Sequence, residues 1–110
     1  MRLPNAEFAV VDIEKLRDYC LNADHPRGRH KARAFAAALG LTADNADKLR
    51  DAILEAASVQ EAFVGIRDDF GRRFVLDFDM ATESGQATVR TGWIVLANDN
   101  LARLTTCYVL

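Results

Sequence analysis

Apolar residues in the first half of the chain recur at intervals of three and four, the spacing of one face of an α-helix. The pattern predicts three helices, over residues 12–22, 26–39 and 42–57. Asp12 is a suitable N-cap for the first helix, and Pro26 is favoured at the first position of the second, which Gly40 ends. Either Thr42 or Asp44 opens the third helix. The side chains expected on the buried faces are Ile13, Leu16, Cys20, Ala32, Phe35, Ala36, Leu39, Ala46, Leu49, Ile53 and Ala56.

From Val59 onward the pattern changes, and apolar residues alternate with polar ones as in strands that have one wet face. Four strands are predicted, over residues 59–68, 73–80, 86–97 and 101–110. Their buried face is expected to carry Phe74, Leu76, Phe78, Met80, Val89, Trp93 and Val95. Because the connections are short, an antiparallel meander is favoured. The predicted fold class is therefore α+β, with three N-terminal helices packed on a four-stranded antiparallel sheet.

The length of 110 residues suits one hydrophobic core and is too short for two. We therefore expect a single domain over residues 1–110, with a helical part at 12–57 and an antiparallel sheet at 59–110. Half of the residues are hydrophobic and 27% are charged, which is typical of a globular protein. No segment approaches the ~20 apolar residues of a membrane span, and the N-terminus has no apolar run of signal-peptide length. These features favour a cytoplasmic protein without membrane contact.

The two cysteines, Cys20 and Cys107, lie far apart and lack the paired spacing of a disulfide framework, so we expect two buried thiols. Zinc binding by these cysteines with His25 and His30 is an alternative, although the spacing matches no common zinc module. Asp77 and Asp79 alternate on one strand, where solvation of an exposed face is the favoured interpretation over cation binding. No nucleotide-binding loop or nucleophile elbow is present. The expectation is a protein with neither metal nor cofactor.

Positive charge is concentrated in residues 25–33, which hold both histidines and four of the fourteen cationic side chains. No carboxylate occurs from His25 through Ala43, whereas the rest of the chain carries ten positive and sixteen negative charges, or −6. This distribution is typical of a site for an anion or a phosphodiester backbone. The alternative is an ordinary solvated helix start. The residues expected to bind phosphate or RNA are Arg27, Gly28, Arg29 and Arg33, together with the free N–H groups of the first helical turn.

Helical geometry distinguishes the polar residues of this segment from one another. His30 falls almost opposite the Phe35 side of its helix and should face water, whereas Lys31 falls on the border and is expected to reach the sheet edge. His25 precedes the helix in a loop, where side chains are presented rather than packed, so it is the preferred catalytic histidine. Its alternative role is that of an N-cap or surface residue.

The last two strands supply possible partners for these residues. Arg90 and Thr105 share a face if the register brings them together, and Tyr108 alternates along the same strand as Thr105. Threonine is also a good strand former, and a tyrosine in this position is more often part of the core than catalytic. The predicted catalytic set is His25, Lys31, Arg90, Thr105 and Tyr108.

Short motifs at both ends of the chain suggest a relationship to known domains. The residues concerned are Leu3-Pro4-Asn5-Ala6, Lys15-Leu16, Asp18-Tyr19, Leu21-Asn22, His25-Pro26, Gly28, Lys31-Ala32, Phe35, Leu39-Gly40, Trp93, Leu104-Thr105-Thr106 and Tyr108. This pattern resembles a family of small bacterial domains that are catalogued without a function. Such domains are often encoded beside a small partner, so the resemblance implies a toxin with a cognate antitoxin or immunity protein.

In element order and residue types the chain also resembles the metal-independent ribonuclease superfamily of barnase, EndoU, the colicin nucleases and the RelE-type toxins. This resemblance implies an endoribonuclease in which a ribose 2′-hydroxyl attacks the phosphodiester. His25 would be the acid or base, Lys31 and Arg90 would stabilise the phosphorane, and Thr105 and Tyr108 would orient the phosphate. The acidic pI of about 5.6 departs from the basic character of those toxins. The alternative function is a non-catalytic binding module, associated with phage or secretion, that docks an acidic partner through the basic helix.

Overall fold

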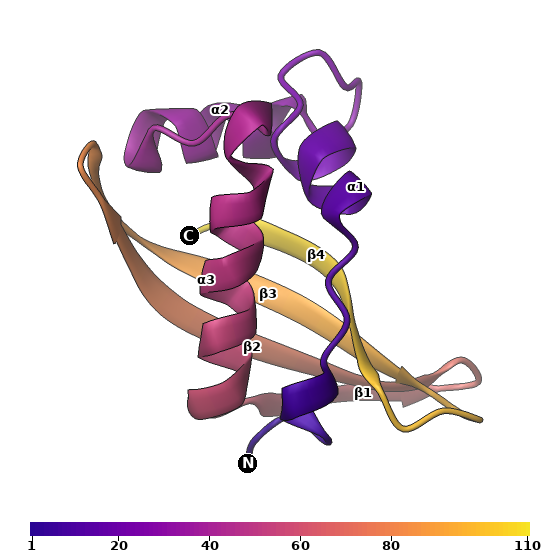
Figure 1. Ribbon diagram of the computed structural model, residues 1–110. Coiled ribbons are helices and arrows are strands. Elements are labelled where there is room, and N and C mark those ends of the chain that lie inside the picture. The colour runs from indigo at the N-terminus through magenta and orange to yellow at the C-terminus, as the bar shows by residue number, and fades with distance from the viewer.

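Helical segments occupy the first half of the chain and strands the second half in the computed structural model, which describes residues 1–110 (Figure 1). The helical segments are α1 (Ile13–Lys15), a π-helical turn (Leu16–Cys20), α2 (Arg29–Leu39) and α3 (Ala46–Val59), with single 3₁₀ turns at Ala6–Phe8 and Ala43–Asn45. The strands are β1 (Phe63–Asp68), β2 (Gly71–Thr82), β3 (Gly85–Leu96) and β4 (Ala102–Val109).

The four strands form one antiparallel sheet in the order β1-β2-β3-β4, so the α+β class and the meander are confirmed. Figure 1 shows the helices on one side of this sheet, with α3 crossing it and α2 lying near the end where the chain terminates. The sheet edges are β1 and β4. Val10 from the N-terminal segment forms a parallel bridge with Arg103 and covers part of the β4 edge.

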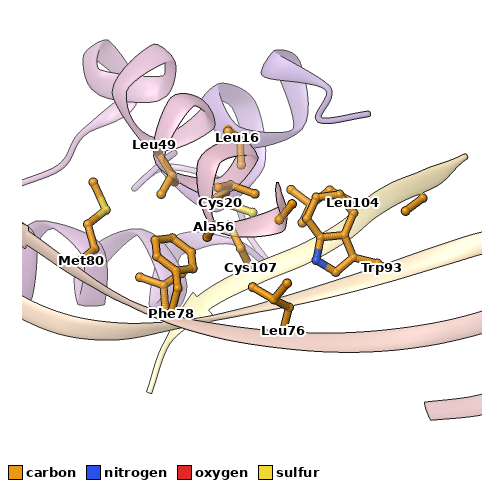
Figure 2. Close-up of a cluster of buried hydrophobic side chains, with 14 of the residues drawn as sticks. Leu16, Cys20, Leu49, Ala56, Leu76, Phe78, Met80, Trp93, Leu104 and Cys107 are labelled. Atoms are coloured by element: carbon orange, nitrogen blue, oxygen red, sulfur yellow. The ribbon is translucent and has the colours of Figure 1, made fainter. Parts of the chain in front are cut away.

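The core fills the space between the helices and one face of the sheet (Figure 2). The predicted inward side chains of β2 and β3 are all buried. Trp93 is 1% exposed, and its indole N–H donates to the hydroxyl of Thr91, which in turn donates to the carbonyl of Leu76. Since a buried polar group without a partner costs about 1–3 kcal/mol, this chain of hydrogen bonds permits Thr91 within the core.

The first predicted helix has an irregular form. Asp12 is its N-cap, as expected, and accepts a hydrogen bond from the backbone N–H of Glu14. Only Ile13–Lys15 is α-helical, however, and the next turn widens into a π-helix. The N–H of Leu21 accordingly donates to the carbonyl of Leu16, five residues back. A sequence argument that assumes 3.6 residues per turn does not predict this widening. Such π-helical turns are often found near functional sites.

The second helix begins later than predicted, because α2 starts at Arg29 with Gly28 as its N-cap. Pro26 therefore lies in the preceding turn, and the prediction that it is the first helical residue is wrong. Ala36 is exposed, so the inward face of α2 is narrower than expected and consists of Ala32, Phe35 and Leu39. Gly40 ends the helix with a left-handed backbone at φ 66°, as predicted.

The third helix extends farther than predicted, since α3 continues through Val59 and β1 begins only at Phe63. No glycine or proline interrupts residues 46–62, so the helical backbone bonds continue until the N–H of Gln60 reaches the carbonyl of Ala56. At the other end, Thr42 forms a capping box with Asn45, whose side-chain oxygen accepts a 2.9 Å hydrogen bond from the Thr42 N–H.

Replacing Thr42 by alanine is expected to lower the free energy of unfolding by about 1 kcal/mol, because the substitution removes one side of the capping box. Urea unfolding followed by circular dichroism would measure the change. Ser58→Ala is a matched control, because the Ser58 hydroxyl bonds only to the Glu55 carbonyl near the end of α3. That control should change stability by less than about 0.5 kcal/mol. Equal effects of the two substitutions would contradict the capping role.

Candidate functional site

Lys31 is the centre of a polar cluster on the edge of β4. Its Nζ donates a 3.1 Å hydrogen bond to Oγ1 of Thr106 and lies 5.0 Å from the ring centroid of Tyr19 and 5.8 Å from that of Tyr108. The side chain is half-buried, and none of the six ion pairs of the structure includes it. The prediction that a border lysine of this helix reaches the sheet edge is confirmed. The ammonium group is therefore held by dipoles and aromatic rings rather than by a carboxylate.

An irregularity between β3 and β4 presents two adjacent threonines together. Gly92 pairs with Thr106 and Trp93 with Leu104, so the register shifts at this point and leaves Thr105 as the additional residue. A Cβ at Gly92 would lie 3.1 Å from Cγ2 of Thr106 and 3.2 Å from Oγ1 of Thr105. Both threonine side chains therefore approach Gly92 from the same side, although consecutive residues in a regular strand face opposite ways.

A cleft of about 580 Å³ opens beside Lys31. Its second cation is Lys15, whose Nζ donates to the backbone carbonyl of Thr105 at 3.4 Å. Two carboxylates also reach the cleft. Asp12 is engaged as the N-cap of α1, whereas the Glu14 side chain has no hydrogen-bond or ion-pair partner. The lining residues are Asp12, Glu14, Lys15, Tyr19, Lys31, Thr105 and Thr106.

Arg90 and Tyr108 lie next to this cluster, on the face of the sheet away from the helices. They are directly opposite each other in the β3–β4 register, and the Arg90 side chain also makes two 2.9 Å hydrogen bonds to the carboxylate of Asp77. These bonds are the main cause of the raised pKa of Arg90, and the neighbouring Tyr108 acts in the same direction. Asp77 thus orients Arg90, and Tyr108 lies between Arg90 and Lys31.

His25 joins the cluster indirectly, through Tyr19. The two rings meet edge to face with centroids 4.7 Å apart. Nδ1 of His25 accepts 3.0 Å hydrogen bonds from the N–H groups of Arg27 and Gly28. Because a nitrogen that accepts two hydrogen bonds carries no proton, the neutral ring has its hydrogen on Nε2. His25 therefore closes the turn before α2 and packs against the tyrosine beneath Lys31.

The N-terminal turn of α2 differs from the predicted phosphate site. The N–H groups of Arg27 and Gly28 are already bonded to His25, and that of Arg29 donates to the His25 carbonyl. Gly28 is buried, and a Cβ there would overlap the carbonyl oxygen of Tyr19. Its close approach is thus to the protein backbone, and its N–H, which was predicted to bind phosphate, is already bonded to His25. The side chains of Arg27, Arg29 and Arg33 are exposed, as is His30.

The structure brings together the predicted site residues in part. Lys31 and Thr105 line the cleft, Tyr108 contacts Lys31, and Arg90 contacts Tyr108. His25 lies behind Tyr19 and outside the lining. The residues that sequence reasoning left out of the predicted set are Glu14, Lys15, Tyr19 and Thr106. Lys15 lies in α1 beside the buried Leu16, so the border argument used for Lys31 applies to it as well. Tyr19 lies in the π-helical turn, where that argument does not hold.

Two buried thiols lie beneath the cluster. Cys20 and Cys107 are free and fully buried, as predicted, and both side chains belong to the core cluster drawn in Figure 2. A hydrogen bond between the thiols lowers the pKa of Cys20 to about 7, and the charges of Lys31 and Lys15 act in the same direction, against the effect of burial. The same hydrogen bond and burial raise the pKa of Cys107. The two lysines thus create a positive potential at this end of β4.

Other parts of the molecule are less suited to an anion. A larger hollow of about 780 Å³ between α3 and β2 is lined by four carboxylates, Asp51, Glu55, Asp79 and Glu83, with Lys48 as its one cation. Nowhere do three or more histidine, cysteine or carboxylate side chains gather in the manner of a metal site. The cleft beside Lys31 is therefore the strongest candidate for an anion-binding site.

No helix of the protein has the length and apolar character needed to cross a bilayer.

Comparison with known proteins supports membership of an uncharacterised family without indicating an activity. A search of the curated proteins finds no match to the sequence. One family model, described as a domain of unknown function, covers the chain from residue 2 to its last residue. This agrees with the resemblance to a small-domain family that is catalogued without a function. Since the match spans residues 2–110, the chain belongs to the DUF6883 family.

Proposed function

We propose that this protein is an endoribonuclease that cleaves RNA at the cleft beside Lys31 without a metal ion. The observation that carries the proposal is the half-buried Lys31 ammonium, which has no carboxylate partner and faces a cleft with a second lysine. A charge held in this way binds an anion without first breaking an ion pair. It also stabilises further negative charge as that develops on a phosphate.

The two threonines and two tyrosines complete a site for a phosphodiester. The hydroxyl groups of Thr105 and Thr106 lie beside Lys31, where they are suited to hydrogen-bond the non-bridging phosphate oxygens. Tyr19 and Tyr108 provide aromatic surfaces against which a base can stack. Arg90 lies beyond Tyr108 and away from the cleft, and two of its N–H groups are occupied by Asp77. Lys31 thus takes the role of neutralising the phosphorane, with Arg90 acting on the flanking backbone.

Cleavage requires a group that accepts the proton of the ribose 2′-hydroxyl, and we assign this role to Glu14. It is the carboxylate of the cleft without a hydrogen-bond partner, whereas Asp12 is engaged at the start of α1. The 2′-oxygen then attacks phosphorus, and the bond to the 5′-oxygen breaks. Lys31, whose ammonium has further N–H groups, supplies the proton to that leaving oxygen. The products are a 2′,3′-cyclic phosphate and a free 5′-hydroxyl.

His25 has a supporting role in this proposal. Its Nδ1 is occupied by two backbone N–H groups, so Nε2 can donate a hydrogen bond but cannot accept a proton in that state. The imidazole instead fixes the position of Tyr19 and thereby the surface beneath Lys31. Arg27, Arg29 and Arg33 remain available to attract the RNA backbone, so binding should weaken as salt increases.

The proposal is tested by incubating the purified chain with mixed RNA oligonucleotides in the presence of a metal chelator. We expect chelator-insensitive cleavage and cyclic phosphate ends, identified by mass spectrometry. Induction of the chain in bacteria should also slow growth, and co-expression of its chromosomal neighbour should relieve the effect if that neighbour encodes an antitoxin. An absence of cleavage across such a library would reject the enzymatic proposal. Salt-sensitive binding of an acidic protein through Arg27, Arg29 and Arg33 would then favour the docking module.

Replacing Glu14 by glutamine is expected to lower kcat about 100-fold with little change in KM, because the amide cannot accept the 2′-hydroxyl proton. Glu55→Gln is the matched control, since Glu55 lies in the acidic hollow, and it should retain the wild-type rate. A normal rate in Glu14→Gln, combined with a loss of activity in His25→Gln, would return the base role to His25.

A further inference from the structure

The edge strand β1 carries an apolar surface that the monomer leaves uncovered. All six of its residues are exposed. Eight large hydrophobic side chains are exposed in the whole chain, and five of them lie between Val59 and Phe70. The ones on or beside the strand include Phe63 at 68%, Ile66 at 73% and Phe70 at 69% exposure. Scattered apolar residues are normal on a surface, but a contiguous group on one sheet edge indicates an interaction site.

The opposite edge of the sheet is protected in a way that β1 is not. Val10 bonds to β4 by donating to the carbonyl of Ala102 and accepting from the N–H of Leu104. Farther along, Lys15 donates to the carbonyl of Thr105. These contacts occupy outward-facing backbone groups of β4, which is a common protection against edge-to-edge pairing. Both backbone groups of Ala62, just before β1, are bonded to Met1. From Phe63 onward the backbone of β1 pairs only with β2, with one bulge between Val64 and Arg67, so this part of the edge is open to an additional strand.

We propose that β1 is the interface of a two-fold homodimer, in which it pairs antiparallel with β1 of a second copy of this chain. Such pairing joins two sheets into one and consumes both open edges, so the assembly closes at two copies. The proposal does not rest on RNA cleavage, because the Lys31 cleft lies at the opposite edge of each sheet.

The sequence of β1 is complementary to itself in one antiparallel register. With Val64 opposite Val64 of the second copy, Phe63 lies opposite a glycine, Gly65, which leaves space for the aromatic ring. This match is confined to the middle of the strand, because a bulge between Val64 and Arg67 adds one residue to β1 and ends a one-to-one register there.

The available area is also of the right size for a dimer. An exposure of two thirds leaves about 100–150 Å² on each phenylalanine. Val59, Phe63, Val64, Ile66 and Phe70, with Met1 beside Ala62, together offer on the order of 600–800 Å². A standard interface buries about 800 Å² from each partner. The apolar surface around β1 thus approaches that area before the backbone edge is counted.

Light scattering and sedimentation equilibrium of the purified chain test this proposal. We expect the dimer to form within a range of protein concentrations that extends to about 100 μM. Val64→Lys places two lysines face to face at the two-fold axis and should weaken the dimer at least about 100-fold. Leu110→Lys, another exposed apolar position, is the control and should leave association unchanged. If Val64→Lys fails to fold by circular dichroism, Ile66→Lys replaces it.

A wild-type chain that is monomeric throughout the concentration range would overturn the proposal. So would a dimer that Val64→Lys and Ile66→Lys leave intact. If the chain is monomeric and binds a different protein through β1, that protein, and not a second copy of the chain, occupies this edge.

Discussion

Replacing Lys31 by methionine is expected to lower kcat/KM for RNA cleavage about 1000-fold. Methionine keeps the apolar stem between Tyr19 and Tyr108 but removes the charge, so the phosphorane loses its nearest stabilising group. Loss of one such group from a preorganised site reduces rates by about 100- to 1000-fold. The upper value is expected here because, in our proposal, Lys31 also protonates the leaving oxygen.

The same substitution should hardly affect folding, which separates its catalytic effect from a structural one. Lys31 loses a single half-buried hydrogen bond to Thr106, so the free energy of unfolding should change by about 1 kcal/mol or less. Lys31→Arg retains the charge but cannot act as a proton donor, and it should recover binding of RNA more than turnover. Lys48→Met is the matched control, since Lys48 is exposed beside the acidic hollow. A Lys31→Met variant with the wild-type rate would refute the proposed site.

The period of the apolar residues was sufficient to predict most of the fold. The buried sets of α3, β2 and β3 follow spacings of three to four and of two, because burial of one face is what those patterns record. The errors lie at element ends, where the pattern carries little information. Val59 continues a helix whose backbone bonds have no breaker, and Pro26 stays outside α2 because His25 caps the turn that contains it.

The candidate site was predictable only where one helix decides the geometry. Lys31 borders the buried face of α2, and that position alone directs it to the sheet edge. The pairing of Thr105 with Thr106 depends instead on the bulge opposite Gly92, and a bulge is set by the packing of two strands rather than by the alternation of either. The role of His25 depends on the atom that its Nδ1 contacts. Composition and spacing contain no information about that contact.

Gly28 is the residue at which fold and candidate site are most directly connected. Its backbone, at φ −86°, is accessible to any residue, so its conformation does not require glycine. The requirement is steric, because a Cβ would overlap the carbonyl oxygen of Tyr19. Close packing at this point holds the His25 turn against the π-helical segment that carries Tyr19.

Replacing Gly28 by alanine is therefore expected to lower the free energy of unfolding by about 3 kcal/mol, at the upper end for an added methyl group in a packed site. The Cβ meets backbone atoms, which cannot rotate away as a flexible side chain does, so the turn itself must shift. That shift moves His25 and Tyr19 relative to Lys31, and RNA cleavage should decrease even at temperatures where the variant is folded. Urea unfolding and the cleavage rate at 4 °C and above would measure the two effects separately.

The neighbouring residue provides the control for this prediction. Arg27 is exposed and free of ion pairs, and Arg27→Ala should change stability by less than about 0.5 kcal/mol while its own N–H still donates to His25. If Gly28→Ala were as stable as Arg27→Ala, the turn would be free to move away from Tyr19, and the fixed contact between His25 and the tyrosine would be refuted. A stable but inactive Gly28→Ala variant would instead indicate that small displacements of Tyr19 suffice to disable the Lys31 cleft, because catalytic groups must lie within fractions of an ångström of their working positions.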